Sequence, residues 1–161
     1  MKTIAFFGHR NIFNKSILQE RIIETLKKVT FKDDCKLLIG CHGEFDNITL
    51  LTCLNFKKNV NPNIKISVVL TNMSYLNKDK YGYNKLTFYE NNNCETIFYD
   101  IENVHYKKRI AFSNKQMVDN SDLIICYVDM TSLKSGAKTI VKYAIKQNKQ
   151  VINLFDEKDK I

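Results

Sequence analysis

Short apolar runs alternate along the chain with segments whose apolar residues recur at helical spacing. The apolar runs predict strands at Lys2–Phe7, Cys35–Ile39, Lys65–Leu70, Thr96–Tyr99, Leu123–Tyr127 and Val151–Leu154. The helical spacing predicts helices over about Lys15–Val29, Asp46–Lys58, Lys107–Asn120 and Ala137–Asn148. Strands and helices therefore alternate through most of the chain.

The strands are continuously apolar rather than alternating, which is typical of a parallel sheet covered on both faces. We therefore expect residues 1–161 to form a single Rossmann-like, doubly wound α/β domain with a mainly parallel sheet flanked by helices. Thr71–Glu95 is polar and rich in tyrosine, and it is expected to be an irregular excursion or lid. In such sheets, ligands bind beyond the carboxyl ends of the strands, near the point where the strand order reverses.

Scarce and chemically capable residues follow three of the predicted strands. The sequence has three histidines and five glycines, and Gly8-His9-Arg10 follows the first strand. The second strand leads into the loop GCHGEFD, which ends at Asp46, and the fifth is followed by Ser135-Gly136-Ala137. These loops meet at one edge of a parallel sheet, which indicates a binding site there.

The residue types in these loops suit a nucleotide. Glycine at positions 8 and 136 lets the backbone approach a ligand. A helix that begins near Ala137 offers unpaired N–H groups to a phosphate, and Ser135 and Thr139 add hydroxyl donors. The Arg10 guanidinium is suited to bidentate pairing with phosphate oxygens.

Carboxylates complete the predicted nucleotide site. Glu44 and Asp46 are acceptors of the kind that hold ribose hydroxyls. Structural alternatives remain open at three positions: Gly136 as a plain turn with Ser135 as N-cap, Arg10 as a surface ion-pair partner, and Asp46 as the N-cap of the second helix. The excursion carries four tyrosines that either stack on a base or only fill that segment: Tyr75, Tyr81, Tyr83 and Tyr89.

Composition narrows the classes of function. The formal charge is +8, but the lysines are spread along the chain and only three basic residues are arginine, which argues against a nucleic-acid partner. No apolar stretch is long enough to span a membrane, and no signal peptide is recognisable, so a cytoplasmic protein without a membrane partner is expected. The five cysteines lack paired spacing, and no metal site or cofactor is predicted. Cys41 as a nucleophile, with His9 or His42 as base, is a further alternative.

Five segments together resemble one known family. FFGHR, GCHGEFD, NKQMVDNSDLIICYV, SGAKT and VINL are similar to the SLOG superfamily, especially a short bacterial branch with GHR, GxxGxFD and GGA-type motifs. The match covers nearly the whole chain outside Thr71–Glu95. It implies a Rossmann-like oligomeric domain that senses or sequesters a nucleotide-derived signal. The ligand-binding residues that it implies are Gly8, His9, Arg10, Gly43, Glu44, Asp46, Ser135, Gly136 and Thr139. Asn114 and Ala137 are predicted ligand-binding residues beside them.

The chain departs from the hydrolytic members of that superfamily, which include the "lonely guy" phosphoribohydrolases. Their PGGxGTxxE motif ends in a catalytic glutamate, whereas SGAKTIVK places Lys142 at that position. A position that holds arginine in other members is Ser113 here. Two functions therefore stay open. One is binding of a nucleotide-derived molecule, and the other is a nucleoside-5′-phosphate N-glycosidase or deoxyribosyltransferase-like enzyme with Glu44 or Asp46 as the catalytic carboxylate.

Overall fold

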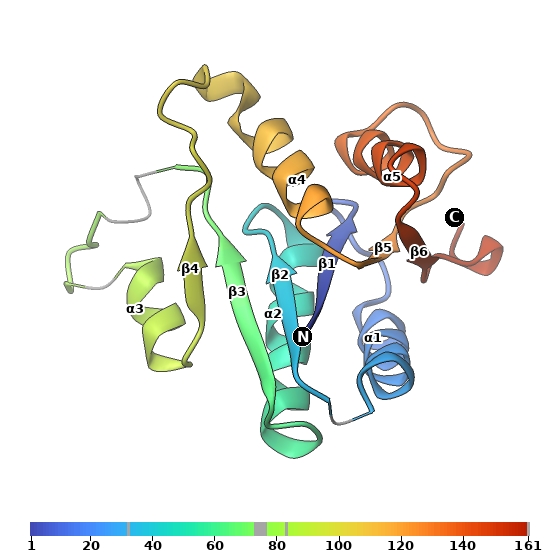
Figure 1. Ribbon diagram of the computed structural model, residues 1–161, viewed down its shortest axis with the longest axis horizontal. Coiled ribbons are helices and arrows are strands. Elements are labelled where there is room, and N and C mark those ends of the chain that lie inside the picture. The colour runs from blue at the N-terminus through green and yellow to red at the C-terminus, as the bar shows by residue number, and fades with distance from the viewer. Residues whose placement is uncertain (32, 73–76, 83, 161) are drawn as a thin grey trace.

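A six-stranded sheet forms the centre of the molecule (Figure 1). The computed structural model describes residues 1–31, 33–72, 77–82 and 84–160. The strands are β1 (Lys2–Gly8), β2 (Cys35–Ile39), β3 (Ile64–Val69), β4 (Glu95–Ile97), β5 (Leu123–Tyr127) and β6 (Gln150–Asn153). Every neighbouring pair is parallel, and the order is β4-β3-β2-β1-β5-β6. This confirms the predicted Rossmann-like α/β fold.

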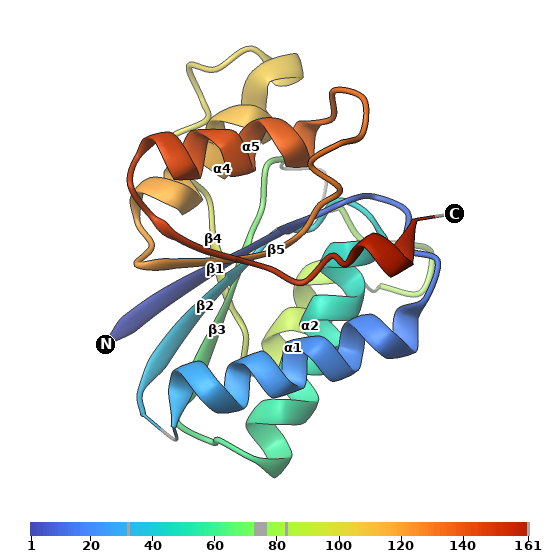
Figure 2. The ribbon, with the colours of Figure 1, turned by 90° about the vertical axis from the view of Figure 1, so that its right-hand side faces the viewer.

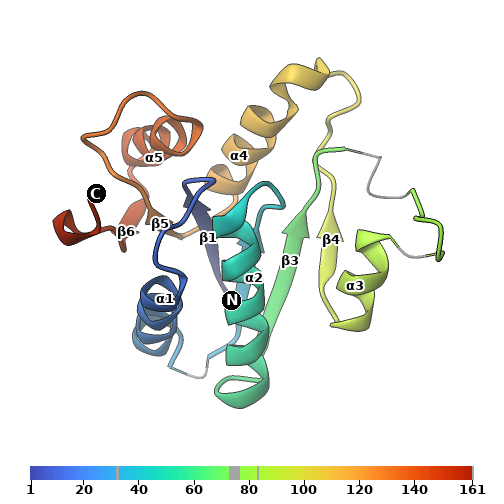
Figure 3. The same cartoon turned by 180° about the vertical axis from the view of Figure 1, so that it is seen from behind.

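Helices cover both faces of the sheet (Figure 2). One face carries α1 (Lys15–Thr30), α2 (Glu44–Asn59) and α3 (Lys85–Asn91), which Figure 3 shows in front of the strands. The other face carries α4 (Arg109–Asp119) and α5 (Gly136–Lys146). Two short 3-10 helices, η2 (Tyr106–Lys108) and η3 (Glu157–Asp159), complete the described elements. No helix in the described ranges is long and apolar enough to cross a membrane.

The two helical layers explain why the strands lack polar alternation. Along β1, Ile4 and Phe6 join the core beneath α1 and α2, whereas Ala5 and Phe7 join the core beneath α4 and α5. All five residues of β5 are buried in the same two-sided way. A strand packed on both faces has no solvent-facing position for a polar side chain.

Two sequence expectations differ from the structure. Residues 71–95 were expected to be irregular, which is wrong for Lys85–Asn91, because these residues form α3 with the Asn84 side chain accepting a hydrogen bond from the Thr87 N–H at 2.9 Å. The second helix begins at Glu44 rather than Asp46, because Gly43 is its N-cap. Asp46 therefore lies in the first turn and is not the cap.

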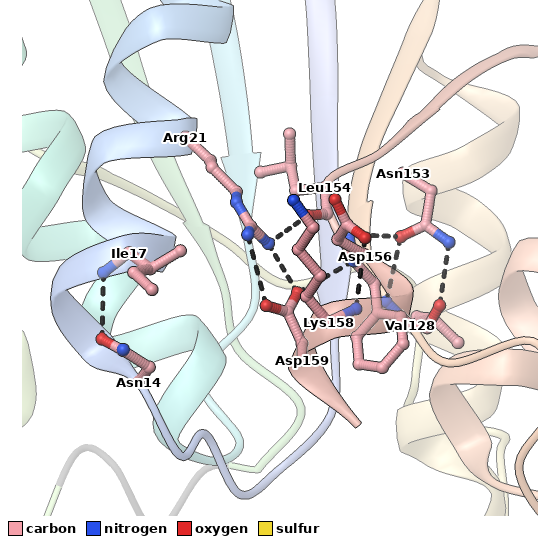
Figure 4. A network of polar contacts seen from close by, with 10 residues as sticks. Asn14, Ile17, Arg21, Val128, Asn153, Leu154, Asp156, Lys158 and Asp159 are labelled. Carbon is pink, nitrogen blue, oxygen red and sulfur yellow. Dashed lines mark hydrogen bonds and ion pairs between the residues drawn. The ribbon is translucent and has the colours of Figure 1, made fainter. Parts of the chain in front are cut away.

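The C-terminal segment is held against α1 and β5 (Figure 4). The Arg21 guanidinium donates to the Leu154 carbonyl at 2.8 Å and pairs with both carboxylate oxygens of Asp159. The Asn153 side chain accepts from the Val128 N–H at 3.1 Å and donates to the Val128 carbonyl at 2.8 Å. These bonds fix the direction in which the chain leaves β5.

Candidate functional site

The strand order reverses between β1 and β5, and His9 joins the loops that follow these strands. The His9 N–H donates to the Tyr127 carbonyl at 3.3 Å, and the Asp129 N–H donates to His9 Nε2 at 2.9 Å. An accepting Nε2 requires a neutral ring with its proton on Nδ1. Burial lowers the pKa of His9, and the Asp129 charge only partly opposes this effect. The lowered pKa favours the neutral ring.

A cavity of about 570 Å³ opens at this reversal, and we call it the central cavity. Its size is in the range of small-molecule sites. Eight of the eleven predicted ligand-binding residues line it: Gly8, His9, Arg10, Asp46, Asn114, Ser135, Gly136 and Ala137. The other three, Gly43, Glu44 and Thr139, lie outside it. Residues from four separate segments of the chain are thus brought together.

Gly8 was expected to let the backbone approach a ligand, but the structure gives it a packing role. A Cβ on Gly8 would lie 2.2 Å from the ring of Phe45, which is itself 1% exposed. Gly40 is similar, since its Cβ would lie 2.8 Å from Oδ2 of Asp46. Both glycines make room for side chains from the start of α2, and both also line the central cavity.

Gly43 and Glu44 position the loop that carries Arg10. Gly43 has a positive φ of 118°, and its Cβ would lie 3.0 Å from the Arg10 Cα. The Glu44 N–H donates to the Arg10 carbonyl at 2.8 Å, and Glu44 Oε2 accepts from the Ile12 N–H at 2.7 Å. Glu44 also pairs with Lys15, its Oε1 lying 3.7 Å from the lysine Nζ. Its carboxylate therefore supports the Arg10 loop.

Arg10 is exposed and brings a positive charge to the cavity. Within the described ranges, no carboxylate forms an ion pair with its guanidinium. Its charge affects two groups that line the cavity. It contributes to the lowered pKa of His42 and partly opposes the rise that burial causes in the pKa of Asp46. The surface ion pair that the sequence left open is therefore not formed with any described residue.

The start of α5 also lines the cavity. The Ser135 hydroxyl accepts from the Lys138 N–H at 3.1 Å, so Ser135 is the N-cap. The N–H groups of Gly136 and Ala137 have no hydrogen-bond acceptor in the part of the chain that the structure describes. A Cβ on Gly136 would meet no atom within 4 Å. Neither packing nor a positive φ therefore requires glycine here, and this N-terminus is open toward the cavity.

Asp46 lies on the wall between the central cavity and a second one. The second cavity, of about 430 Å³, is lined by Gly40, Cys41, Gly43, Asp46, Asn47, Leu50, Leu51, Lys85, Phe88 and Tyr89. Asp46 Oδ2 accepts from the His42 N–H at 2.8 Å. Burial raises the pKa of Asp46 to about 6, against the lowering effects of that hydrogen bond and of Arg10. Its carboxyl group is thus able to take up or release a proton near neutral pH.

His42 and Cys41 have their own partners around the second strand's loop. His42 Nε2 lies 2.7 Å from the Thr71 hydroxyl, and burial is the main cause of its lowered pKa. The Cys41 thiol donates to the Val69 carbonyl at 3.3 Å and lies 3.6 Å from His42 Nε2. Cys41 lines the second cavity and not the central one. This placement gives no support to a nucleophilic role in the central cavity.

Several other candidates are placed differently from the expectation. The Thr139 hydroxyl donates to the Ser135 carbonyl at 2.9 Å, so its proton stays within the helix. Lys142, which the sequence resemblance aligns with the glutamate of the hydrolytic SLOG proteins, is exposed and does not line the central cavity. Tyr89 is buried beside the second cavity and Tyr81 is exposed. Tyr75 and Tyr83 lie outside the described residues.

Sequence reasoning missed the apolar lining of the cavity. Ile110 and Met117 contribute it from α4, and Ile140 contributes it from α5. The signal was present, because Ile110, Asn114 and Met117 recur at the i, i+4 and i+7 spacing of one helix face. Asn11, Gly40 and His42 complete the polar lining without having been predicted as ligand-binding residues.

Neither a search for metal-binding groups nor a comparison with known proteins assigns a function to the site. Within the described ranges, no group of three or more histidine, cysteine or acidic residues could hold a metal ion. No family model matches the chain, and no curated protein matches it either. Membership of the SLOG superfamily and oligomerisation therefore stay predictions based on the sequence motifs.

Proposed function

We propose that this chain binds a nucleotide-derived small molecule in the central cavity and thereby senses or sequesters it. The observation that carries the proposal is that the unpaired Arg10 guanidinium and the open start of α5 line the same cavity. A helix N-terminus and an arginine are complementary to a phosphate group, through backbone N–H donors and bidentate hydrogen bonds respectively. The phosphate would lie between Arg10 and the N–H groups of Gly136 and Ala137.

The rest of the cavity suits a nucleoside. Ile110, Met117 and Ile140 offer an apolar surface to a base or sugar ring, and Asn114 adds an amide donor and acceptor among them. Asp46 also lines the cavity, and its carboxyl oxygens can exchange hydrogen bonds with sugar hydroxyls. The neutral His9 ring keeps its Nδ1 proton free to donate to the ligand.

Binding is favoured over cleavage by the positions of the carboxylates. Glu44 is committed to the Ile12 N–H and to Lys15, and it does not line the central cavity. Lys142, where the hydrolytic family has its glutamate, is also outside the cavity. One observation keeps the N-glycosidase or deoxyribosyltransferase-like alternative open. Asp46 lines the cavity with a pKa raised to about 6, and a general acid needs such a value.

Calorimetric titration with a panel of nucleotides tests the proposal, and each mixture is then chromatographed to detect released base. We expect the ligand to be bound without being cleaved. Binding should be lost in Arg10→Ala and in Gly136→Asp, because the latter places a negative side chain in the proposed anion site. Lys146→Ala, at the opposite end of α5, removes one charge and serves as the control.

The outcomes separate the two functions. Release of free base that is lost in Asp46→Asn would establish the enzyme. Binding that is insensitive to both Arg10→Ala and Gly136→Asp would refute the phosphate position. Absence of binding across the panel would refute the nucleotide proposal for those ligands.

A further inference from the structure

A groove between α4 and α5 continues from the central cavity. It has a volume of about 540 Å³, and Figure 1 shows the two helices side by side on the same face of the sheet. Six residues line both spaces: Arg10, Ile110, Asn114, Ser135, Gly136 and Ile140. The proposed phosphate position at the start of α5 is therefore the junction of the central cavity and this groove.

The rim of the α4–α5 groove is positively charged. Lys107 and Lys115 come from the α4 side and Lys134 from the loop before α5, and no aspartate or glutamate is among the described lining residues. None of the three lysines forms an ion pair with a described carboxylate. Lys115 Nζ instead lies 5.5 Å from the centroid of the Tyr143 ring. Like charges gathered around one groove repel each other unless an anion compensates them.

The floor of the groove is apolar. Ile110, Ala111 and Ile140 form it, and the ring of Tyr143 closes one side. The Tyr143 hydroxyl donates to Asp119 at 2.9 Å, which keeps this carboxylate engaged outside the groove lining. The basic side chains at the rim suit an anionic group of a small molecule, and the apolar side chains suit the uncharged part of the same ligand. The groove is less suited to a polynucleotide backbone, because it leads into the central cavity rather than across an open surface.

We propose that the α4–α5 groove is a second anion-binding subsite, so that the ligand carries at least two phosphate-type groups. The first lies at the start of α5, and the second extends between Lys107, Lys115 and Lys134. The proposal rests on the proposed function, because the first phosphate sets the starting point of the extension. It adds a specificity: a polyphosphorylated nucleotide binds more tightly than the corresponding monophosphate.

Titration calorimetry with AMP and ATP on the wild type and on a triple variant, Lys107→Gln, Lys115→Gln and Lys134→Gln, tests the proposal. A single exposed charge pair is worth a factor of a few in affinity, so the triple variant should lose about ten-fold or more for ATP. Its affinity for AMP should change by about two-fold at most. The control variant, Lys27→Gln, Lys28→Gln and Lys58→Gln, removes the same charge from exposed positions on α1 and α2 and should keep both affinities.

Each other outcome overturns the proposal in a distinguishable way. Equal wild-type affinities for AMP and ATP, with Arg10→Ala still abolishing both, would remove the second subsite and leave the proposed function standing. The absence of binding of either nucleotide would remove both. Loss of affinity for a single-stranded oligonucleotide in the triple variant, with ATP binding unchanged, would assign the lysines to a polynucleotide surface instead.

Discussion

Asp46→Asn should raise the free energy of unfolding at neutral pH and should change it little below about pH 4. Burial raises the pKa of Asp46 from 3.8 to about 6 in the folded state. Protonation therefore favours the folded state, and the wild type loses stability as the pH rises from about 4 to about 6. Asparagine cannot ionise, and its side-chain oxygen can still accept the hydrogen bond that the His42 N–H donates at 2.8 Å.

The size of the effect follows from the two pKa values. A shift of about two units corresponds to about 3 kcal/mol, since each unit is worth about 1.4 kcal/mol. The free energy of unfolding of Asp46→Asn should then exceed that of the wild type by about 1 kcal/mol near pH 4.5 and by about 3 kcal/mol near pH 7.5. The increase with pH is the signature, because a general packing effect of asparagine would be the same at both values.

Urea denaturation of both proteins across this pH range measures the difference. Asp34→Asn, at an exposed position before β2, corrects for the loss of one negative charge. If the stability difference between Asp46→Asn and the wild type is constant with pH after this correction, the raised pKa is refuted. The Asp46 carboxyl group would then not serve as an acid near neutral pH.

Two further predictions concern stability elsewhere. Gly8→Ala should destabilise the protein by about 2 kcal/mol, because its Cβ would lie 2.2 Å from the Phe45 ring, whereas Gly136→Ala should be neutral or slightly stabilising because its Cβ meets no atom within 4 Å. Thermal and urea unfolding of the two variants compare these values, and equal effects would contradict the assigned roles. Arg21→Gln should lower the free energy of unfolding by about 2 kcal/mol, because it breaks the paired hydrogen bonds to Asp159. An unchanged unfolding midpoint in the same assays would contradict the contribution of these bonds.

The fold was predictable because its signals are local. Continuous apolar strands such as Leu123–Tyr127 and regularly spaced helices require no knowledge of distant contacts. The helix α3 was missed because Lys85–Asn91 spans only seven residues in a polar region. Tyr89 is the buried residue of this helix. Its burial in the core is visible in the three-dimensional structure but not in the local sequence pattern.

The site was predictable as a location but less so as a set of roles. The carboxyl-end rule placed Arg10, Asp46 and Gly136 together without any coordinates. It could not show that Glu44 turns toward the Ile12 N–H and away from the cavity, since that depends on how the two loops pack. The α4–α5 groove was also not predicted, because Lys134 precedes α5 and meets Lys107 and Lys115 only through the packing of α5 against α4.

The packing of the loops also separates structural from functional glycines. Gly8 is restricted by the Phe45 ring, and Gly43 is restricted by its positive φ of 118° and by the Arg10 backbone. Gly40 lies close to the Asp46 carboxylate, the movable end of a side chain. These contacts give the glycines structural roles that involve no ligand.

Two exposed features remain available to a ligand: the Arg10 guanidinium, which forms no ion pair with a described carboxylate, and Gly136, whose Cβ would meet no atom within 4 Å. Both lie on the central cavity and both suit an anion, so they, rather than the motifs as a whole, support a phosphate at this position.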